Sequence, residues 1–303
     1  MENFIITMTY LFVGVGLRRL PRFPEETGNV LSLFVIYVSL PALVLLKVPE
    51  LEYSAKLLVP TLMPWAMLLV TALLILLAAR LLGWSREITG SLLLLVPLGN
   101  TSFLGIPMVT AFFGESGVPY AVIYDQLGSF LALATYGTVV ISVYGGGADK
   151  PGLGDVIKKI VIFPPFIALV LAALLKTAVY PPVTMRILEA LAGTLVPVVM
   201  IAVGFQLTVR ISRQALAPLG LGLFLKLAAA PLLALAGCRF LGLGGEAVEV
   251  AIFEAGMPPM VSAGALAILA GLAPALTAAL VGLGIILSFV TLPILYYLLG
   301  FLS

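Results

Sequence analysis

Most of this chain consists of apolar segments that are long enough to cross a lipid bilayer. Of its 303 residues, 62% are hydrophobic and 10% are charged, whereas soluble domains average about 25% charged residues. A helix needs about 20 mainly apolar residues to span a membrane. Polar and turn-forming residues divide the chain into ten such segments: 3–18, 29–47, 57–82, 88–112, 118–144, 157–177, 186–209, 215–241, 247–271 and 275–301. We therefore predict an all-α membrane protein with ten transmembrane helices.

The residue composition excludes several classes of function. The chain has no histidine and one cysteine, Cys238, so the usual zinc sites, an intrachain disulfide and a histidine-based triad are excluded. It has no Walker A motif, no dinucleotide fingerprint after a strand and no basic run suited to nucleic acid. Asp125 and Glu254 share no motif of nucleophile and base, so a membrane-embedded enzyme is only a remote alternative. We expect no enzymatic activity, no organic cofactor and no nucleic-acid partner.

The distribution of lysine and arginine predicts the orientation of the chain. Ten of these residues lie in loops that follow odd-numbered segments, and five lie on the opposite side. Cytoplasmic loops carry the excess of positive charge. The protein is therefore expected in the cell (inner) membrane with both termini outside the cytoplasm. The first segment is expected to be a short membrane helix rather than a signal peptide, because its arginines follow the apolar run.

Two halves of the chain resemble each other at a fixed offset of 159 residues. The run Arg80–Gly83 matches Arg239–Gly242, Glu87 matches Glu246, and Gly105 matches Gly264. Each half holds five predicted helices, and this odd number makes the second half enter from the other face. We predict two inverted five-helix repeats, at 1–145 and 156–303, joined by a cytoplasmic linker at 146–155.

Two short runs interrupt the fourth and ninth apolar segments. They are Pro97-Leu98-Gly99-Asn100-Thr101-Ser102 and Glu254-Ala255-Gly256-Met257-Pro258-Pro259. Lipid cannot satisfy the backbone groups that proline and glycine release, so such breaks occur only where they line a protein or water cavity. Broken helices in matching halves are the best sequence signal for the binding site of a secondary transporter. We therefore expect the broken fourth and ninth helices to cross.

The ninth segment carries a carboxylate beside its break. Ionisable residues inside a span cost about 2.5–3.5 kcal/mol on insertion scales and are functional candidates. Carboxylate and freed carbonyl oxygens at Glu254 suit a hard cation such as sodium. A proton-carrying role is a second possibility, and an ion pair with Lys226 of the eighth segment is the structural alternative. The two alternatives are compatible, because cation binding can break a salt bridge between Glu254 and Lys226.

The fourth segment offers neutral polar groups and amide dipoles instead. N-terminal ends of half-helices favour an anion such as a carboxylate, which Asn100 would contact unless its side chain only caps the helix. Asp125 lies early in the fifth segment near tyrosines typical of a membrane interface. It is therefore either a site residue or a solvated interfacial carboxylate. Gln206 is expected to be structural, and Lys47 is expected to extend to the surface.

The sequence resembles the auxin efflux carrier family. The run Val96–Pro107 followed by Phe113-Gly114 looks like that family's fourth-helix signature, and Ala255–Pro259 looks like its ninth-helix motif. The short central loop is similar to that of bacterial members. The resemblance implies a scaffold domain (helices one, two, six and seven), a transport domain (three to five and eight to ten) and substrates such as auxin, malate or malonate. It allows a homodimer. By motif position, the implied substrate-site residues are Asn100, Thr101, Pro97, Pro258 and Pro259.

A more distant similarity is to the bile-acid sodium symporter family, whose ninth-helix glutamate binds sodium. Glu254-Ala255-Gly256-Met257 matches that motif, whereas Pro258-Pro259 replaces a glutamine and an asparagine. This departure removes two side-chain ligands and argues against bile acids as substrate. By position, the implied cation site comprises Glu254, Asn100, Thr101, Ser102 and Ser129, with Asp125 as a further candidate and Na⁺ as the ion.

These features together predict a secondary active transporter of small organic anions that works by alternating access in the lipid membrane. Coupling to sodium, coupling to protons and uncoupled transport all remain open. A channel is a further alternative.

Overall fold

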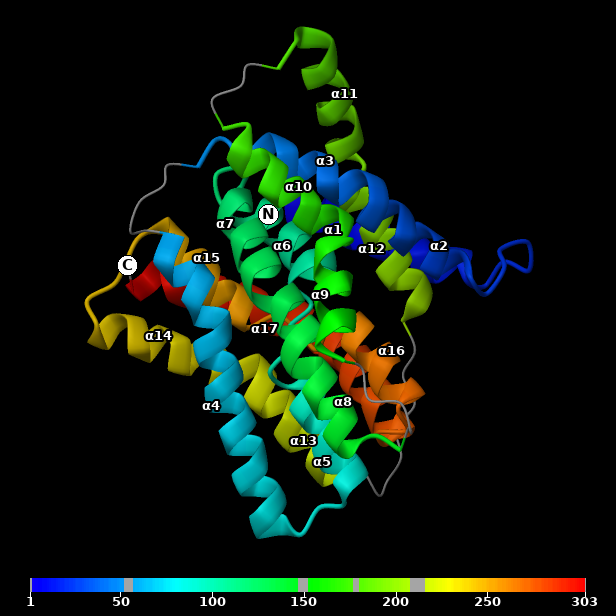
Figure 1. The fold of residues 1–303 in the computed structure, drawn as a ribbon, viewed down its shortest axis with the longest axis vertical. Helices are drawn as coiled ribbons and strands as arrows, with labels where there is room; N and C mark the ends of the chain where they lie inside the picture. Colours follow the sequence, from blue (N-terminus) through cyan, green and yellow to red (C-terminus); the bar gives the residue numbers. More distant parts are fainter. Residues whose placement is uncertain (1, 52–56, 147–151, 177–179, 208–215, 303) are drawn as a thin grey trace.

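The computed structural model describes residues 2–51, 57–146, 152–176, 180–207 and 216–302. Every regular element in these ranges is a helix (Figure 1). Residues 147–151 of the predicted linker, and the ends of some predicted segments, lie outside the described residues. The all-helical prediction is confirmed for the described part of the chain.

The predicted segments of the first half all contain helices. The first is α1 (Glu2–Leu17), and the third is α4 (Leu58–Leu82). The second combines α2 (Thr27–Phe34), the π-helical turn η1 (Val35–Ser39) and α3 (Leu40–Lys47). The fourth comprises α5 (Arg86–Leu95), η3 (Thr101–Gly105) and α6 (Ile106–Phe113). The fifth comprises α7 (Val118–Ile123), η4 (Tyr124–Phe130), η5 (Leu133–Gly137) and α8 (Thr138–Tyr144).

The second half contains helices in all of its predicted segments as well. The sixth segment holds α9 (Leu153–Val161) and α10 (Pro164–Leu174), and the seventh holds α11 (Pro182–Gly193) and α12 (Leu195–Gln206). The eighth comprises α13 (Leu216–Phe224), η7 (Leu225–Ala229) and α14 (Ala230–Phe240). The ninth holds α15 (Glu246–Ala255) and α16 (Val261–Leu269), and the tenth is α17 (Pro274–Leu302).

Six helices within the described residues are long and apolar enough to cross a membrane, and a bent pair would add a seventh. The bent pair is α9 and α10, which meet at 64°. The segment predicted at 157–177 is therefore bent rather than one straight helix, and its crossing of the membrane as one span stays a prediction. Proline lacks an amide hydrogen and disfavours helix in the residue before it. Pro164 therefore begins a new helix after Phe163, whose backbone is extended. The count of ten spans stays a prediction, because α1 and the helices that flank the two breaks are shorter.

The helices pack in two groups. In one, α1 packs on α12, α12 on α2, and α3 on both α10 and α11. In the other, α4 contacts α5, α15 and η4, and α5 also contacts α16 and α17. Figure 1 shows α3, α10 and α11 toward the upper end of the molecule and α5 and α13 toward the lower end, with α4 running down one side. Contacts of α6 with α1 and α12 join the groups.

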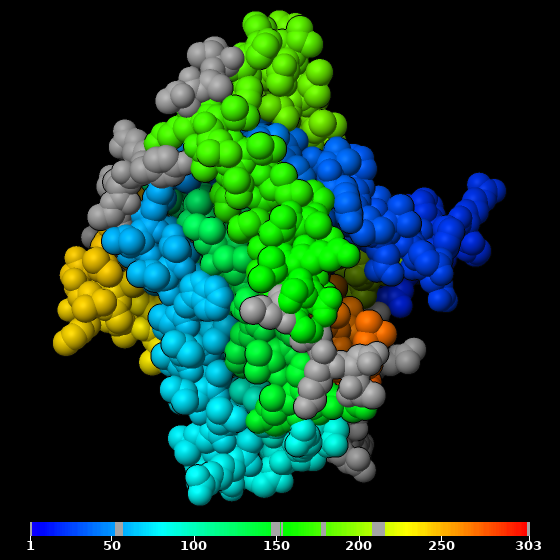
Figure 2. Space-filling model, in the orientation of Figure 1, coloured from blue at the N-terminus to red at the C-terminus, as the bar shows by residue number. Residues whose placement is uncertain are grey.

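Large apolar side chains cover much of the outer surface. On α4, Leu69 and Leu73 are 62% and 66% exposed, and Phe240 at the end of α14 is 90% exposed. Figure 2 shows α4 as a light-blue column beside the green residues of α8–α10 on this face. Exposed apolar area on this scale is unfavourable in water and fits contact with lipid chains.

Positions related by the 159-residue offset share a backbone feature. Gly83 follows α4 with a φ of 65°, and Gly242 follows α14 with a φ of 66°. Glycine adopts this left-handed conformation without the steric penalty of a side chain. Each glycine is followed by a ten-residue helix, α5 or α15, that ends at a break. The two halves therefore have similar local structure at these positions.

Candidate transport site

The two interrupted helices meet backbone to backbone. The amide of Asn100 donates to the carbonyl of Pro258 at 2.8 Å, and the amide of Met260 donates to the carbonyl of Leu98 at 3.0 Å. Gly99 and Pro259 lie opposite each other as an antiparallel bridge. Buried backbone groups need hydrogen-bond partners, and each break supplies partners for the other. Extended segments from the two halves therefore lie side by side where α5 and α15 end.

The side-chain NH2 group of Asn100 has no hydrogen-bond acceptor among the described residues. Asn100 is 3% exposed, its side chain makes no capping hydrogen bond, and its Nδ2 atom lacks an acceptor among the described residues. The backbone carbonyl oxygen of Asn100, by contrast, accepts from the backbone amides of Leu104 and Gly105. The capping alternative for the Asn100 side chain is therefore wrong. A buried donor without a partner is costly and is available to a ligand.

Asn100 lies in the wall of a cavity of about 190 Å³. Typical small-molecule sites measure about 300–1,000 Å³, so this cavity suits a ligand of few atoms. It lies between the two groups of helices, with Ile36, Leu40 and Phe163 from one group. The other group contributes Asn100, Ser102, Phe103, Asp125, Phe130, Leu133, Met260 and Ser262.

Asp125 is a buried hydrogen-bond acceptor within the helical core. It is 1% exposed, and its Oδ1 atom accepts from the hydroxyls of Thr101, at 2.6 Å, and Ser102. Its Oδ2 atom accepts from the Gln126 side chain at 2.6 Å. Tyr124 is also buried, at 4% exposure. A solvated, interfacial Asp125 is therefore wrong, because the π-helical turn η4 directs it toward the first break.

Glu254 lies on the last turn of α15 and is completely buried. Neither of its carboxylate oxygens has a hydrogen-bond partner among the described residues. Lys226, on η7, donates to the carbonyl of Ala255 at 3.4 Å. No ion pair joins Lys226 to Glu254 among the described residues. The expected ion pair is therefore replaced by a lysine that binds the neighbouring carbonyl.

The other predicted site residues lie around the paired breaks. Pro97 is buried, Ser129 is buried one turn after Asp125, and Thr101 uses its hydroxyl on Asp125. Pro258 and Pro259 are buried against α17, where the Cβ of an alanine at Gly284 would lie 2.6 Å from Pro259 Cδ. Asn100, Ser102 and Asp125 therefore share the cavity wall, whereas Glu254 and the prolines lie outside its lining.

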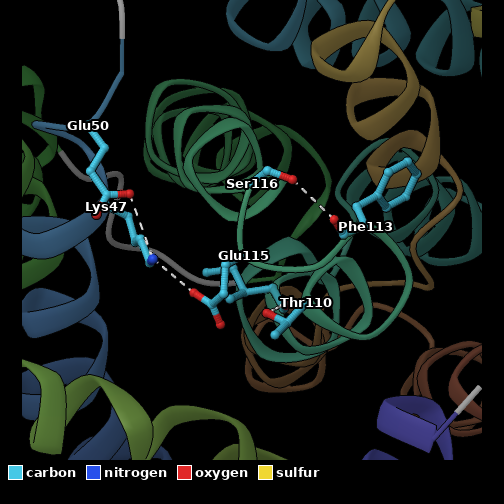
Figure 3. Close-up of polar contacts among 7 residues, drawn as sticks. Lys47, Glu50, Thr110, Phe113, Glu115 and Ser116 are labelled. Carbon is cyan, nitrogen blue, oxygen red and sulfur yellow. Dashed lines mark hydrogen bonds and ion pairs between the residues drawn. The ribbon is translucent and has the colours of Figure 1, made fainter.

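A second polar cluster connects the two groups of helices away from the breaks (Figure 3). Lys47, at the end of α3, pairs with Glu115 at 2.9 Å and with Glu50 at 3.7 Å. Glu115 lies in the loop between α6 and α7. The Lys47 side chain is 18% exposed, and its partners Glu50 and Glu115 are 59% and 67% exposed. The extension of Lys47 to the surface stays a prediction. This ion pair borders a cavity of about 300 Å³ that Glu189 and Thr110 also line.

Comparison with known proteins now identifies the class of this molecule. The sequence profile of the membrane transport protein family matches residues 1–151 and 152–296. The chain belongs to this family. It is 30% identical over 217 residues to an uncharacterized transporter of Methanocaldococcus jannaschii, with 69% of each chain covered. It is 28% identical over 297 residues to an uncharacterized transporter of Methanothermobacter thermautotrophicus, covering 97% of this chain and 96% of the relative.

Membership of this family confirms the resemblance to auxin efflux carriers. The family is one of transport proteins, and the two relatives are named as transporters rather than enzymes. Together with the apolar helices, it identifies an integral membrane protein. The similarity to bile-acid symporters stays a prediction.

Sequence reasoning missed several residues of this site. Gln126 is completely buried and donates to Asp125, and its Oε1 atom has no partner among the described residues. Phe163 stacks on Phe130, with ring centroids 3.9 Å apart, at the edge of the cavity. The Phe163-Pro164-Pro165 run could have indicated the bend, but no local pattern indicated where Gln126 would point.

Two glycines of the fourth segment make room for charged side chains of the second half. An alanine Cβ at Gly105 would lie 2.4 Å and 2.6 Å from the two carboxylate oxygens of Glu254. A Cβ at Gly99 would lie 3.1 Å from Lys226 Nζ. Cβ atoms do not approach other atoms as closely as at Gly105, so a side chain there would displace Glu254. The charges of the second half therefore pack directly against the first break.

Proposed function

We propose that this membrane transport protein is a secondary transporter of small organic anions, carboxylates in particular. The observation that carries the proposal is the unpartnered Asn100 amide at the cavity between the two groups of helices. Hydrogen bonds to charged groups contribute about 1.5–3 kcal/mol, enough to make a carboxylate a favoured ligand. The cavity volume of about 190 Å³ limits the substrate to a small acid such as malonate or malate.

The proposed architecture is two inverted five-helix repeats with ten spans and both termini outside. The matched glycine conformations after α4 and α14 support equivalence of the halves. The antiparallel backbone pairing of the two breaks supports a crossover near the membrane midplane. A homodimer stays a prediction.

The proposed mechanism is alternating access by movement of a transport domain (α4–α8 and α13–α17) against a scaffold (α1–α3 and α9–α12). The anion cavity lies between these groups, as a carrier of this kind requires. On one side of the breaks, the Lys47–Glu115 ion pair joins the groups. Next to the anion cavity, a cavity of about 530 Å³ shares Phe130, Leu133 and Phe163 with it and includes Lys159. We infer that this larger cavity is the entrance for anions from the cytoplasm.

Binding of malonate and malate to the purified protein tests the proposed function. Ligands raise the melting temperature of the state that they bind. The wild type should be stabilised by at least one small carboxylate, and Asn100→Ala should reduce the affinity roughly tenfold to hundredfold. Asn29→Ala is the matched control, because Asn29 is exposed on α2. Equal affinities of the wild type and Asn100→Ala would refute a substrate contact by Asn100.

Sodium coupling through Glu254 also stays a prediction. The buried carboxylate without hydrogen-bond partners supports a role in holding a cation or a proton. Uptake into liposomes is measured with sodium, with potassium and across a pH series, for the wild type and Glu254→Gln. A coupling role requires that Glu254→Gln alters the response to sodium or to pH. Unchanged uptake and unchanged responses would remove Glu254 from the coupling mechanism.

A further inference from the structure

The short helix α9, which lies between α8 and α10 in Figure 1, has three distinct faces. Side chains three or four residues apart share one face of a helix. Val156 and Ile160 are half-buried, whereas Ile157 and Val161 are exposed. The third face is exposed and charged, and it consists of Asp155, Lys158 and Lys159. An exposed apolar face beside a face with a net positive charge is typical of helices at the boundary between lipid headgroups and acyl chains.

The charge of Lys159 is available to a ligand. Lys159 forms no ion pair among the described residues. Asp155, one turn earlier on the same face, uses its carboxylate to accept from the backbone amide of Gly152 at 2.9 Å. Lys158 adds a second positive charge beside Lys159, and each ammonium carries three hydrogen-bond donors. This face of α9 therefore favours an anionic ligand.

Lys159 also lines the cavity of about 530 Å³ that adjoins the anion cavity. This volume lies within the range of about 300–1,000 Å³ that small-molecule sites have, and such sites combine apolar walls with a few polar groups. Most of this wall is apolar and includes Leu133, Ile141, Leu266 and Leu269. Its polar lining consists of Lys159, Thr138 and Ser142, and no carboxylate lines it among the described residues. The cavity therefore matches a ligand with an apolar body and a negative charge.

The cavity is closed toward the anion site and open toward the outer surface. The rings of Phe130 and Phe163 stack with their centroids 3.9 Å apart, and both residues line both cavities. Leu269 also lines the larger cavity and is 83% exposed. Lys159 lies on the same helix as the exposed apolar residue Ile157. The open side of the cavity therefore adjoins a surface that suits lipid.

We propose that this cavity binds one anionic phospholipid, with an acyl chain against the apolar wall and the phosphate at Lys159. Phosphate oxygens accept strong hydrogen bonds from an ammonium group. The hydroxyl of Ser142 is a second donor in the lining, whereas the hydroxyl of Thr138 already donates to the carbonyl of Ala134 at 2.8 Å. A free phosphate or a small carboxylate uses only the charge and leaves the apolar wall uncovered. A lipid satisfies both parts of the cavity.

The bound lipid contacts both groups of helices. Lys159 and Phe163 belong to the proposed scaffold, whereas Leu133 and Leu266 belong to the proposed transport domain. A ligand that contacts both stabilises the state in which the two parts of its site are together. The lipid also occupies the proposed entrance for carboxylates, so it slows their uptake. This effect on uptake rests on the proposed function, whereas lipid binding does not.

Native mass spectrometry of the detergent-purified protein tests lipid binding without any transport substrate. The protein receives equal amounts of phosphatidylglycerol and phosphatidylcholine with identical acyl chains, and the bound lipids are counted. The wild type should retain one phosphatidylglycerol in preference to phosphatidylcholine. Lys159→Gln should weaken this preference about fivefold, because it removes one basic residue from an anionic lipid.

Lys158→Gln is the matched control, because Lys158 is exposed beside Lys159 on α9 but lies outside the lining of the cavity. It should keep the preference of the wild type within about twofold. An equal loss in both variants would assign the preference to the basic face of the helix alone. That result, or a wild type without any preference for phosphatidylglycerol, overturns the inference.

The deacylated headgroup, glycerophosphoglycerol, distinguishes a lipid site from a phosphate site. It carries the same phosphodiester but no acyl chain, so a large excess should leave the bound phosphatidylglycerol in place. Displacement of the lipid by this soluble headgroup would show a site for free phosphate esters and overturn the proposal of a lipid.

Uptake of labelled malonate into proteoliposomes separates this inference from the proposed function. Phosphatidylglycerol should slow wild-type uptake relative to pure phosphatidylcholine, and Lys159→Gln should reduce this difference. Equal wild-type uptake in the two lipids would contradict a lipid that blocks the entrance. A protein that takes up no carboxylate would refute the proposed function, while mass spectrometry would still decide whether the cavity binds a lipid.

Discussion

The two helix breaks occupy equivalent places in the two halves, yet they present opposite chemistry. The first break presents a neutral amide donor, Asn100, to a cavity. The second break buries two charged side chains, Glu254 and Lys226, away from the cavity lining. The backbones of the two breaks satisfy each other through the Asn100–Pro258 and Met260–Leu98 hydrogen bonds. The backbone pairing is shared, but the side chains differ: Asn100 has an unused donor at the cavity, whereas Glu254 and Lys226 are buried outside the cavity lining.

The largest effect on stability is expected from removing one of the two buried charges at the second break. Glu254 and Lys226 are both buried, and a charge that is left uncompensated inside the protein typically costs about 3–5 kcal/mol. We expect Glu254→Gln and Lys226→Met each to lower the apparent melting temperature strongly. The double variant should lose less stability than the sum of the single losses, by about 0.5–3 kcal/mol.

Glu249→Gln serves as the control for this cycle, because Glu249 lies on the same helix and is only partly buried. Its melting temperature should stay near that of the wild type. Strict additivity of Glu254→Gln and Lys226→Met would contradict an electrostatic coupling between these two charges.

The contact between the two breaks is tested next by Gly105→Ala. The new Cβ would lie within 2.6 Å of both Glu254 carboxylate oxygens, and overpacking of this kind costs about 1–3 kcal/mol. We expect a lower melting temperature, measured by the same thermal unfolding. Gly220→Ala on α13 is the control, because no atom lies within 4 Å of its Cβ position. Equal stability of Gly105→Ala and Gly220→Ala would show that Glu254 does not pack against the first break.

The smallest effect is expected at the ion pair that joins the two groups of helices away from the breaks. Glu115 is 67% exposed, and exposed ion pairs contribute about 0–1 kcal/mol. Glu115→Gln should therefore leave the melting temperature nearly unchanged. It should raise the rate at which a membrane-impermeant maleimide labels Thr110→Cys by up to about fivefold, because Thr110 lines the cavity beside the pair.

Glu25→Gln, at an exposed position, controls for the loss of a negative charge in this labelling experiment. An unchanged labelling rate in Glu115→Gln would show that the Lys47–Glu115 ion pair does not control the opening of that cavity.

Local sequence signals predicted the breaks and the helices, because proline, glycine and long apolar runs act within a few residues. They also selected Asn100 and Glu254, since polar groups inside apolar segments are rare. The bend at Phe163 was not predicted, and the burial of Asp125 was only one of two alternatives. These features depend on a π-helical turn and on packing between distant segments, as the Asp125 contacts with Thr101 and Ser102 show. The contacts of Asp125 have no local pattern, whereas the two prolines after Phe163 are a local signal for the bend.

The hydrogen-bond acceptor of Lys226 was not predicted from the sequence either. Its charge and depth in the eighth segment were evident from the sequence, and Glu254 was the expected partner. The observed acceptor is a backbone carbonyl that two prolines leave free. Side-chain identity alone does not indicate such an acceptor.

The central claim, that Asn100 binds a small carboxylate at the first break, is tested most directly by isothermal titration of malonate or malate into the purified protein. The account predicts saturable binding to the wild type and to Asn29→Ala, and roughly tenfold to hundredfold weaker binding to Asn100→Ala. Equal affinity for the wild type and Asn100→Ala, or no binding of any small carboxylate to the wild type, would contradict it.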